Sequence, residues 1–330
     1  MTPETKPPPH EHRLLPERTT LMIKADTIYQ TAKDLNVKAA IEIPRDVKHR
    51  IEGMRDKETN HLSHYVLVKI LENYEVAVQD QRPMCADTGL PRYYVKIGNE
   101  AVIEGGMVTL EKMLRQATAE TTAEIPLRPN RVHPFSRKDH NNNVGIHAPT
   151  VDYTFEPDMD AIDITVVHKG GLFGADYRML FPADGVPGLK RFFLDTLAEF
   201  LRRGMSCQPA VIGIGVGGTK DVCVRLAKEA ACLRIVGDRN PDPSLAALEE
   251  ELIALGTQSG FGPMGFPGNS AVLDVHIEAA YAHTGGMPVA VQQFCYAQRR
   301  MSGRVFPDGT VAYREDPQWF TPYYRRETIA

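Results

Sequence analysis

The sequence predicts an α/β fold of mixed sheets with surrounding helices. Segments with the character of strands alternate with segments of helical periodicity, above all in the second half of the chain, and this order is typical of α/β proteins. The chain has 330 residues, of which 42% are hydrophobic and 24% charged. That length can bury a sizeable core, and the composition excludes a disordered or collagen-like protein.

Helical spacing of apolar residues predicts eight helices, over 28–36, 44–56, 61–79, 108–124, 188–203, 219–233, 243–256 and 269–283. Apolar and β-branched segments predict strands over 93–97, 151–155, 161–168, 210–216 and 287–294. The pair Asp308–Gly309 between apolar residues predicts a hairpin. The long polar stretch 125–149, rich in Pro, Asn and His, is typical of a functional loop.

The two ends of the chain differ from the rest. Residues 1–20 contain three consecutive prolines and no apolar run, so we expect a disordered tail rather than a signal peptide, with order beginning near Leu21. Residues 302–330 form a C-terminal aromatic arm that contains Trp319, either for docking or packed on its own domain. No stretch reaches the roughly 18 apolar residues of a membrane helix, and we expect a cytoplasmic protein.

Charge and glycine patterns bear on possible ligands. The net charge of −4 argues against a protein dedicated to nucleic-acid binding. The segments 213–218 and 260–265 both match G-x-G-x-x-G, and Asp238 follows the first, so a nicotinamide-dependent oxidoreductase is an alternative. However, the first glycines of 213–218 fall inside an apolar strand, where glycine more often lets two backbones pass closely.

The cysteines are few and odd in number, which argues against a secreted disulfide scaffold. Cys223 and Cys232 lie in an apolar helical segment and are expected to pack in the core. Cys85, Cys207 and Cys295 lie where elements meet loops, with polar neighbours. Three thiolates are one short of a closed zinc site, and three can also hold a [4Fe-4S] cluster, so spacing leaves both open.

Several motifs resemble one family in their order along residues 25–301. They are Cys-Ala-Asp-Thr-Gly at 85–89, Pro-Leu-Arg-Pro-Asn at 126–130, Asn-Val-Gly at 143–145, Lys-Gly-Gly at 169–171, Cys-Gln-Pro at 207–209, Gly-Pro-Met-Gly at 262–265 and Cys-Tyr-Ala-Gln-Arg-Arg at 295–300. The sequence thereby resembles the α subunit of the two-subunit iron–sulfur hydro-lyases, the class I fumarase and L(+)-tartrate dehydratase family.

The resemblance implies a fold like the class I fumarase α domain and a set of site residues. It implies a [4Fe-4S] cluster with one open iron in a domain spanning 21–301. The implied residues are the cluster ligands Cys85, Cys207 and Cys295, the catalytic Asp87 and His283, and the substrate-binding Arg128, Lys169, Gly170 and Gly171. His283 matches a histidine at a helix end. An open iron is a Lewis acid, and an arginine suits a substrate carboxylate.

The resemblance also implies a partner, because residues 302–330 are too few for the second domain of single-chain relatives. We therefore expect a β subunit, in an α2β2 assembly, and a small dicarboxylate substrate. Fumarate or malate is the first expectation and L(+)-tartrate the second. Ala86 and Phe173 depart from the family pattern and suggest a third, a methyl-substituted dicarboxylate. The oxidoreductase and a non-catalytic zinc or cluster scaffold remain as alternatives.

Overall fold

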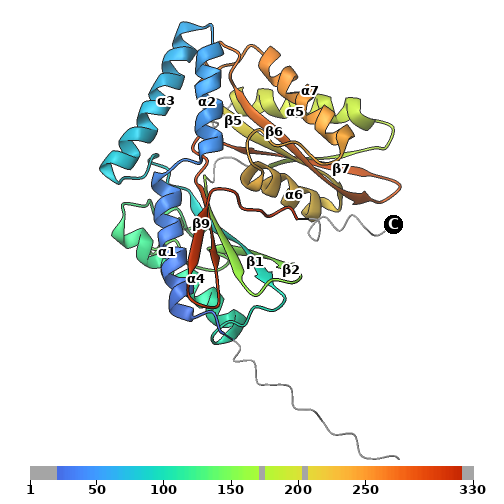
Figure 1. The fold of residues 1–330 in the computed structure, drawn as a ribbon. Helices are drawn as coiled ribbons and strands as arrows, with labels where there is room; N and C mark the ends of the chain where they lie inside the picture. Colours follow the sequence, from blue (N-terminus) through green and yellow to red (C-terminus); the bar gives the residue numbers. More distant parts are fainter. Residues whose placement is uncertain (1–20, 171–174, 203–206, 322–330) are drawn as a thin grey trace, which may run out of the picture.

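The computed structural model describes residues 21–170, 175–202 and 207–321, so the expected tail 1–20 lies outside the described residues. The helices are α1 (Ala25–Ile41), α2 (Arg45–Lys57), α3 (His61–Asp80), α4 (Gly106–Glu124), α5 (Gly185–Arg202), α6 (Lys220–Leu233), α7 (Pro243–Gln258) and the 3₁₀ helix η1 (Pro263–Gly265). The strands are β1 (Leu90–Gly98), β2 (Thr150–Glu156), β3 (Ile162–Lys169), β4 (Ala175–Leu180), β5 (Ala210–Gly218), β6 (Val272–Ala282), β7 (Met287–Phe294), β8 (Arg300–Val305) and β9 (Val311–Arg314). Two mixed sheets with surrounding helices confirm the predicted α/β class (Figure 1). Among the described helices none is long and apolar enough to cross a membrane.

The first sheet has the strand order β2-β1-β3-β8-β9. Strands β1 and β2 are parallel, and the other neighbours are antiparallel. Helices α1 and α4 cover one face, where Leu35 and Leu114 are fully buried in one cluster with Tyr93 and Ile164. Burying one apolar stripe of each helix against the apolar face of a sheet is the main stabilising contribution to such a layer.

The second sheet has the strand order β4-β7-β5-β6, with β5 and β6 parallel. Helix α6 covers one face, and α5 and α7 cover the other (Figure 1). A Cβ on Gly213 would lie 2.1 Å from the Ala227 carbonyl oxygen, and one on Gly215 would lie 1.9 Å from the Cys223 carbonyl oxygen. The glycines of 213–218 therefore let β5 lie directly on α6. They lie within β5 rather than in a phosphate-binding turn, so the nicotinamide interpretation of this motif is wrong.

A shared core joins the two sheets through α6. Tyr94 of the first sheet, Cys232 of α6 and Phe294 of the second sheet belong to one cluster of buried residues. Trp319 belongs to the same cluster, is 3% exposed, and lies edge-on to the Tyr94 ring with the centroids 5.3 Å apart. The described part of the aromatic arm thus packs on its own domain.

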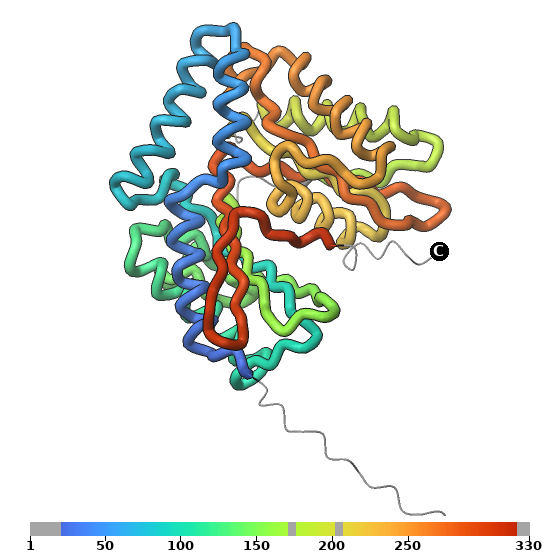
Figure 2. Tube along the Cα trace, in the orientation of Figure 1, coloured from blue at the N-terminus to red at the C-terminus, as the bar shows by residue number. Residues whose placement is uncertain are grey.

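The predicted hairpin at Asp308–Gly309 is confirmed, and it connects β8 and β9. Gly309 has φ 86°, a left-handed conformation that glycine adopts without strain. This C-terminal hairpin lies beside the N-terminal helix α1 (Figure 2), where the Tyr313 hydroxyl donates to Asp34 Oδ2 at 2.6 Å. Strand β8 begins at Arg300 and ends at Val305. The first sheet therefore includes residues on both sides of position 301, where the domain was expected to end.

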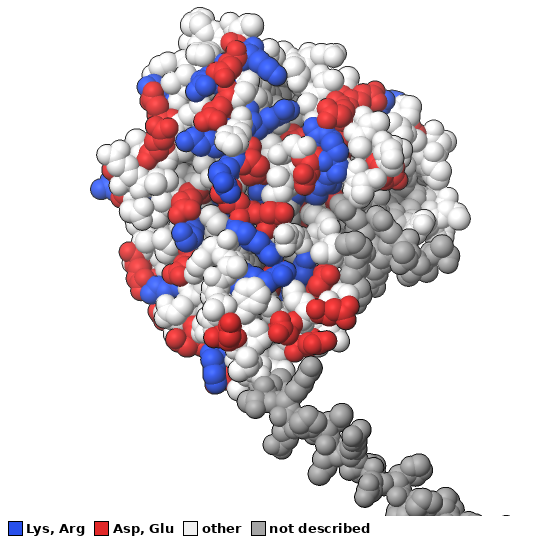
Figure 3. All heavy atoms as spheres, viewed as in Figure 1, with Lys and Arg blue, Asp and Glu red and all other residues white. Residues whose placement is uncertain are grey.

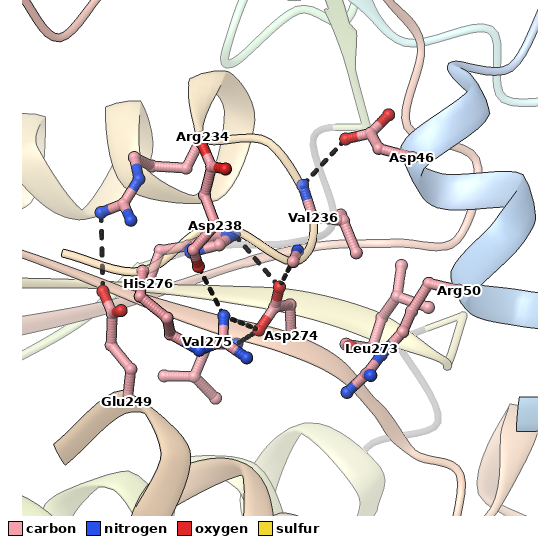
Figure 4. Close-up of polar contacts among 12 residues, drawn as sticks. Asp46, Arg50, Arg234, Val236, Asp238, Glu249, Leu273, Asp274, Val275 and His276 are labelled. Carbon is pink, nitrogen blue, oxygen red and sulfur yellow. Dashed lines mark hydrogen bonds and ion pairs between the residues drawn. The ribbon is translucent and has the colours of Figure 1, made fainter. Parts of the chain in front are cut away.

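The helix predicted over 269–283 is wrong, because this segment forms strand β6. Its apolar residues alternate with Asp274, His276 and Glu278, the period-2 pattern of a strand. All three polar residues are nevertheless buried, and neighbouring segments supply partners for Asp274 and Glu278. Figure 4 shows the contacts of Asp274. Asp274 accepts from Gly237 N at 2.6 Å, and Arg234 lies 2.9 Å from Glu278. Strand β4, at an edge, was not predicted either.

Acidic and basic side chains are interspersed on the face of the molecule in Figure 3. Lys and Arg total 38 and Asp and Glu total 42, so neither sign dominates the chain. This face offers no continuous basic area that could follow a nucleic-acid backbone.

Candidate active site

Three cysteines from distant parts of the sequence meet beside the second sheet. Cys207 lies three residues before the start of β5 and Cys295 directly follows β7, and these antiparallel strands pair Val211 with Phe294. Tyr296 N donates to the Cys207 carbonyl oxygen at 3.2 Å, which fixes the two ends against each other. Cys85 lies between α3 and β1 and packs against the same core cluster as Cys207 and Cys295.

The thiols of this cluster influence one another electrostatically. Burial, followed by the nearby thiols of Cys295 and Cys85, raises the pKa of Cys207 to about 11. Burial also raises the pKa of Cys295, which is 3% exposed, whereas Cys85 and Cys207 are half-buried. Without a bound cation the thiols of Cys207 and Cys295 are therefore protonated at neutral pH, and a metal centre would have to displace their protons.

The donor set of the three cysteines is thiolate alone, a ligand type that zinc sites and iron–sulfur clusters share. In the part of the chain that the structure describes, no group of three or more His, Cys, Asp or Glu side chains is arranged around one metal position. A single zinc ion needs its thiolates as close tetrahedral neighbours, whereas each thiolate of a [4Fe-4S] cluster binds a different iron. Three thiolates are the number that a [4Fe-4S] cluster with one open iron would need, so the residues present fit such a group.

Cys223 and Cys232 lie on α6 and are 0% and 1% exposed. The Cys223 thiol contacts the Lys220 carbonyl oxygen at 3.3 Å, as a helical side chain does with its own preceding turn. Both cysteines are core residues, which confirms the prediction that they pack.

The loop at 85–89 carries Asp87 at the surface of the cysteine cluster. Asp87 Oδ1 accepts from Gly89 N and from Asn130 Nδ2, each at 3.1 Å. The first of these bonds is a local turn interaction of the kind that aspartate makes in many loops. The second ties Asp87 to the polar loop 125–149. One carboxylate oxygen is thus anchored, which orients the other.

The segment containing Arg128 is fixed to the Asp87 loop through its backbone. Arg128 N donates to Thr88 Oγ1 at 2.9 Å, and Thr88 is 2% exposed. The Arg128 side chain is exposed, so its guanidinium is accessible to a ligand. The structure therefore brings the backbone of Arg128 next to the Asp87 loop that follows Cys85, and the roles expected of Asp87 and Arg128 stay predictions.

Asn143 organises this loop, a role that the sequence analysis missed. Its Oδ1 accepts from Asn130 N at 2.8 Å and from Arg131 N at 3.2 Å. Its Nδ2 donates to Thr122 Oγ1 at 3.2 Å and to the Arg128 carbonyl oxygen at 3.1 Å. Asn143 is 1% exposed and has φ 56°, a conformation that asparagine tolerates better than most residues. The sequence feature that could have identified Asn143 is its position in the Asn-rich loop 125–149.

Lys169 ends β3 and lies on the inner side of the cysteines. Its ammonium is 5.8 Å from the centre of the Phe294 ring, and it interacts electrostatically with the thiols of Cys232 and Cys295. Burial lowers the pKa of Lys169 to about 8, so it still carries a positive charge at neutral pH. Gly170 is buried next to it, and Gly171, like Phe173, lies outside the described residues.

His283 lies apart from the cysteine cluster. It is exposed in the turn between β6 and β7, where its Nδ1 accepts from Gly285 N at 3.0 Å. Cys295 follows the other end of β7, and the 8 residues of that strand span roughly 25 Å. The expectation of a helix end at His283 is wrong, since β6 is a strand, and a single chain does not bring this side chain to Asp87.

Comparisons with known proteins agree with the motifs of the site. The family model described as fumarate hydratase (Fumerase) matches residues 29–304. A Methanocaldococcus jannaschii protein named "Putative L(+)-tartrate dehydratase subunit alpha" is 39% identical over 272 residues, covering 81% of this chain and 93% of the relative. The L(+)-tartrate dehydratase subunit alpha of Escherichia coli K12 is 32% identical over 270 residues, covering 81% and 87%.

The family match extends from α1 to β8 and includes all three clustered cysteines and the Asp87 and Arg128 loops. A match of this extent covers both sheets and the candidate site together. The chain therefore belongs to the fumarate hydratase (Fumerase) family of hydro-lyases, in the branch of the class I fumarase and tartrate dehydratase α subunits.

Proposed function

We propose that this chain is the cluster-bearing α subunit of an iron–sulfur hydro-lyase that removes water from L(+)-tartrate. The observation that carries the proposal is the meeting of Cys85, Cys207 and Cys295 beside the Asp87 and Arg128 loops. Fumarate or malate was the first expectation from sequence. The names of the curated relatives favour L(+)-tartrate instead, the second expectation, and fumarate becomes the alternative.

The three cysteines would hold a [4Fe-4S] cluster with one open iron. When bound, that iron supplies a Lewis acid that stabilises the departing hydroxide of a 2-hydroxy acid. The Arg128 guanidinium suits a substrate carboxylate, since it can bind both oxygens in one plane. The anchored Asp87 carboxylate is the candidate base for the proton on the neighbouring carbon, and this proton and the hydroxide together make the water that leaves.

The relatives are named as α subunits, and we propose that a β subunit completes the site. An exposed apolar area beside the cysteines supports this. Phe261, Met264 and Phe266 are 37%, 39% and 41% exposed. Met264 N donates to the Gln208 carbonyl oxygen at 3.4 Å, which brings this loop next to Cys207. An apolar rim around a polar site is a surface that a partner covers.

Association with the β subunit is tested by co-expression and co-purification. Met264→Asp buries a charge in the proposed interface and should prevent the two chains from copurifying. Val108→Asp is the matched control, because Val108 is an exposed valine on α4 and its variant should copurify normally. Mass measurement of the complex tests the α2β2 stoichiometry. Equal copurification of both variants would refute this interface.

His283 remains a candidate catalytic residue only within an assembly that brings the β6–β7 turn of another chain to the site. Its replacement by alanine in the co-purified complex should then lower kcat. Replacement of the neighbouring Tyr281, which is 100% exposed, serves as the control. Unchanged kcat in the His283→Ala complex would remove this residue from the mechanism.

The substrate is tested with the pair of subunits purified without oxygen. We expect kcat/KM to be highest for L(+)-tartrate, lower for fumarate and lower still for mesaconate, the methylated substrate that Ala86 suggested. Higher kcat/KM for fumarate would return the assignment to fumarate hydratase. A preparation that turns over none of these substrates would contradict the proposed activity.

A further inference from the structure

Arg299 is a buried cation directly behind the cysteine cluster. It follows Cys295 by one short turn and is 1% exposed. Its backbone is fixed on both sides, since Arg299 N donates to Ala297 O at 2.9 Å and Arg299 O accepts from His168 N at 2.9 Å. The guanidinium is fixed as well, because Nη1 donates to the Asp87 carbonyl oxygen.

The charge of Arg299 has no carboxylate partner among the described residues. The two nearby arginines differ: Arg300 lies 2.9 Å from Asp46 Oδ2, and Arg304 lies 2.7 Å from Asp163 Oδ1. Arg299 Nε is buried and makes no hydrogen bond within the described chain. A buried charge without a counter-ion costs several kcal/mol, so the fold retains Arg299 at a cost in stability.

The groups near Arg299 include two of the clustered thiols, a neutral imidazole and a second buried cation, Lys169. Burial raises the pKa of both Cys207 and Cys295, and Arg299 opposes this rise at both. Burial and then Arg299 lower the pKa of His168 to about 3, so its ring is uncharged at neutral pH. His168 Nε2 lies 2.9 Å from Asn36 Oδ1, and Asn36 Nδ2 donates to Tyr93 and Ala32, so Nε2 carries the ring proton.

We propose that Arg299 is a positioning residue that supplies a fixed positive charge behind the cluster, in addition to that of Lys169, and holds the Asp87 loop against it. This inference rests on the proposed function. Three thiolates outweigh the charge of a [4Fe-4S]²⁺ core, so the bound group is anionic and needs a cation in its low-dielectric surroundings. Net charge and hydrogen bonding near a cluster set its reduction potential.

The test compares Arg299→Gln, which removes the charge, with Arg299→Lys, which keeps it, in the co-purified complex. Arg300→Lys is the control, because Arg300 is the adjacent and equally buried arginine whose charge pairs with Asp46. The measurements are iron and sulfide per chain, the midpoint potential of the cluster, and its rate of loss in air.

We expect Arg299→Gln to have a more negative midpoint potential and to lose its cluster roughly tenfold faster than wild type, since one unit charge has gone from its surroundings. Arg299→Lys should keep the potential, and so should the control. If Arg299→Gln does not fold, the Arg299→Lys variant decides. A wild-type midpoint potential in this variant supports the inference, and a changed potential contradicts it. Equal potentials for Arg299→Gln and wild type would overturn this inference, whereas a wild-type complex without iron would overturn the proposed function.

Discussion

Asn143 connects the fold to the proposed substrate loop, and its replacement by alanine is the sharpest test of that connection. The side chain makes four hydrogen bonds, to Asn130 N, Arg131 N, Arg128 O and Thr122 Oγ1. Alanine makes none of them and leaves buried polar groups without partners. The loop that carries Arg128 then loses its attachment to α4.

The expected destabilisation follows from these contacts. Each hydrogen bond contributes about 1 kcal/mol net, so four contribute about 4 kcal/mol. Alanine in the left-handed conformation adds about 1 kcal/mol. Water that enters the opened loop recovers part of this, so we expect a loss of about 4 kcal/mol in the free energy of unfolding.

Asn141→Ala is a closely matched control. Asn141 has φ 57° against 56° for Asn143, lies in the same loop, and has an exposed side chain. It should lose only the conformational contribution of about 1 kcal/mol. Denaturant unfolding of both variants measures the difference, and kcat/KM of the co-purified complex should fall only for Asn143→Ala. Equal losses of stability in the two variants would refute the organising role of Asn143.

Three further predictions concern the second sheet, a buried histidine and the helical cysteines. Gly215→Ala should cost more than about 4 kcal/mol in denaturant unfolding, because its Cβ meets the α6 backbone, whereas Gly53→Ala, with nothing within 4 Å, should be neutral or stabilising. The pKa of His168 is lowered from 6.5 to about 3, so its contribution to stability is complete above pH 6.5 and is lost as the pH falls towards 3. Between pH 7 and 5 wild type should lose about 2 kcal/mol that His168→Gln does not lose, and parallel pH profiles would contradict this. Cys232→Ala should lower stability and leave iron per chain unchanged, and loss of iron would make Cys232 a ligand.

The sequence was most informative where local chemistry decides the structure. The periodicity of α1 to α4 and the Asp308–Gly309 turn predicted elements that the structure confirms. The five cysteines could be divided by their neighbours into helical packing positions and loop-junction positions, although the loop-junction Cys295 is itself buried. The resemblance then added Asp87 and Arg128, whose loops contact each other through Thr88 and Asn130.

The predictions from sequence failed where contacts between segments far apart in the chain decide the structure. The segment at 269–283 was predicted to be a helix but forms β6. Its buried Asp274 and Glu278 find their partners in Gly237 and Arg234 of the α6–α7 connection, which a local pattern does not reveal. The expectation that His283 ends a helix failed for the same reason, because this residue follows the strand β6. Arg299 and Asn143 act through contacts with residues far along the chain, and such contacts leave no local pattern.

The central claim is that Cys85, Cys207 and Cys295 hold a four-iron cluster with one iron open to substrate. Mössbauer spectroscopy of the α–β complex, grown on iron-57 and purified without oxygen, tests it most directly. We expect about four irons per α chain, with one iron site in four changing when L(+)-tartrate is added. A complex without iron, or a cluster whose iron sites are all unchanged by substrate, would contradict it.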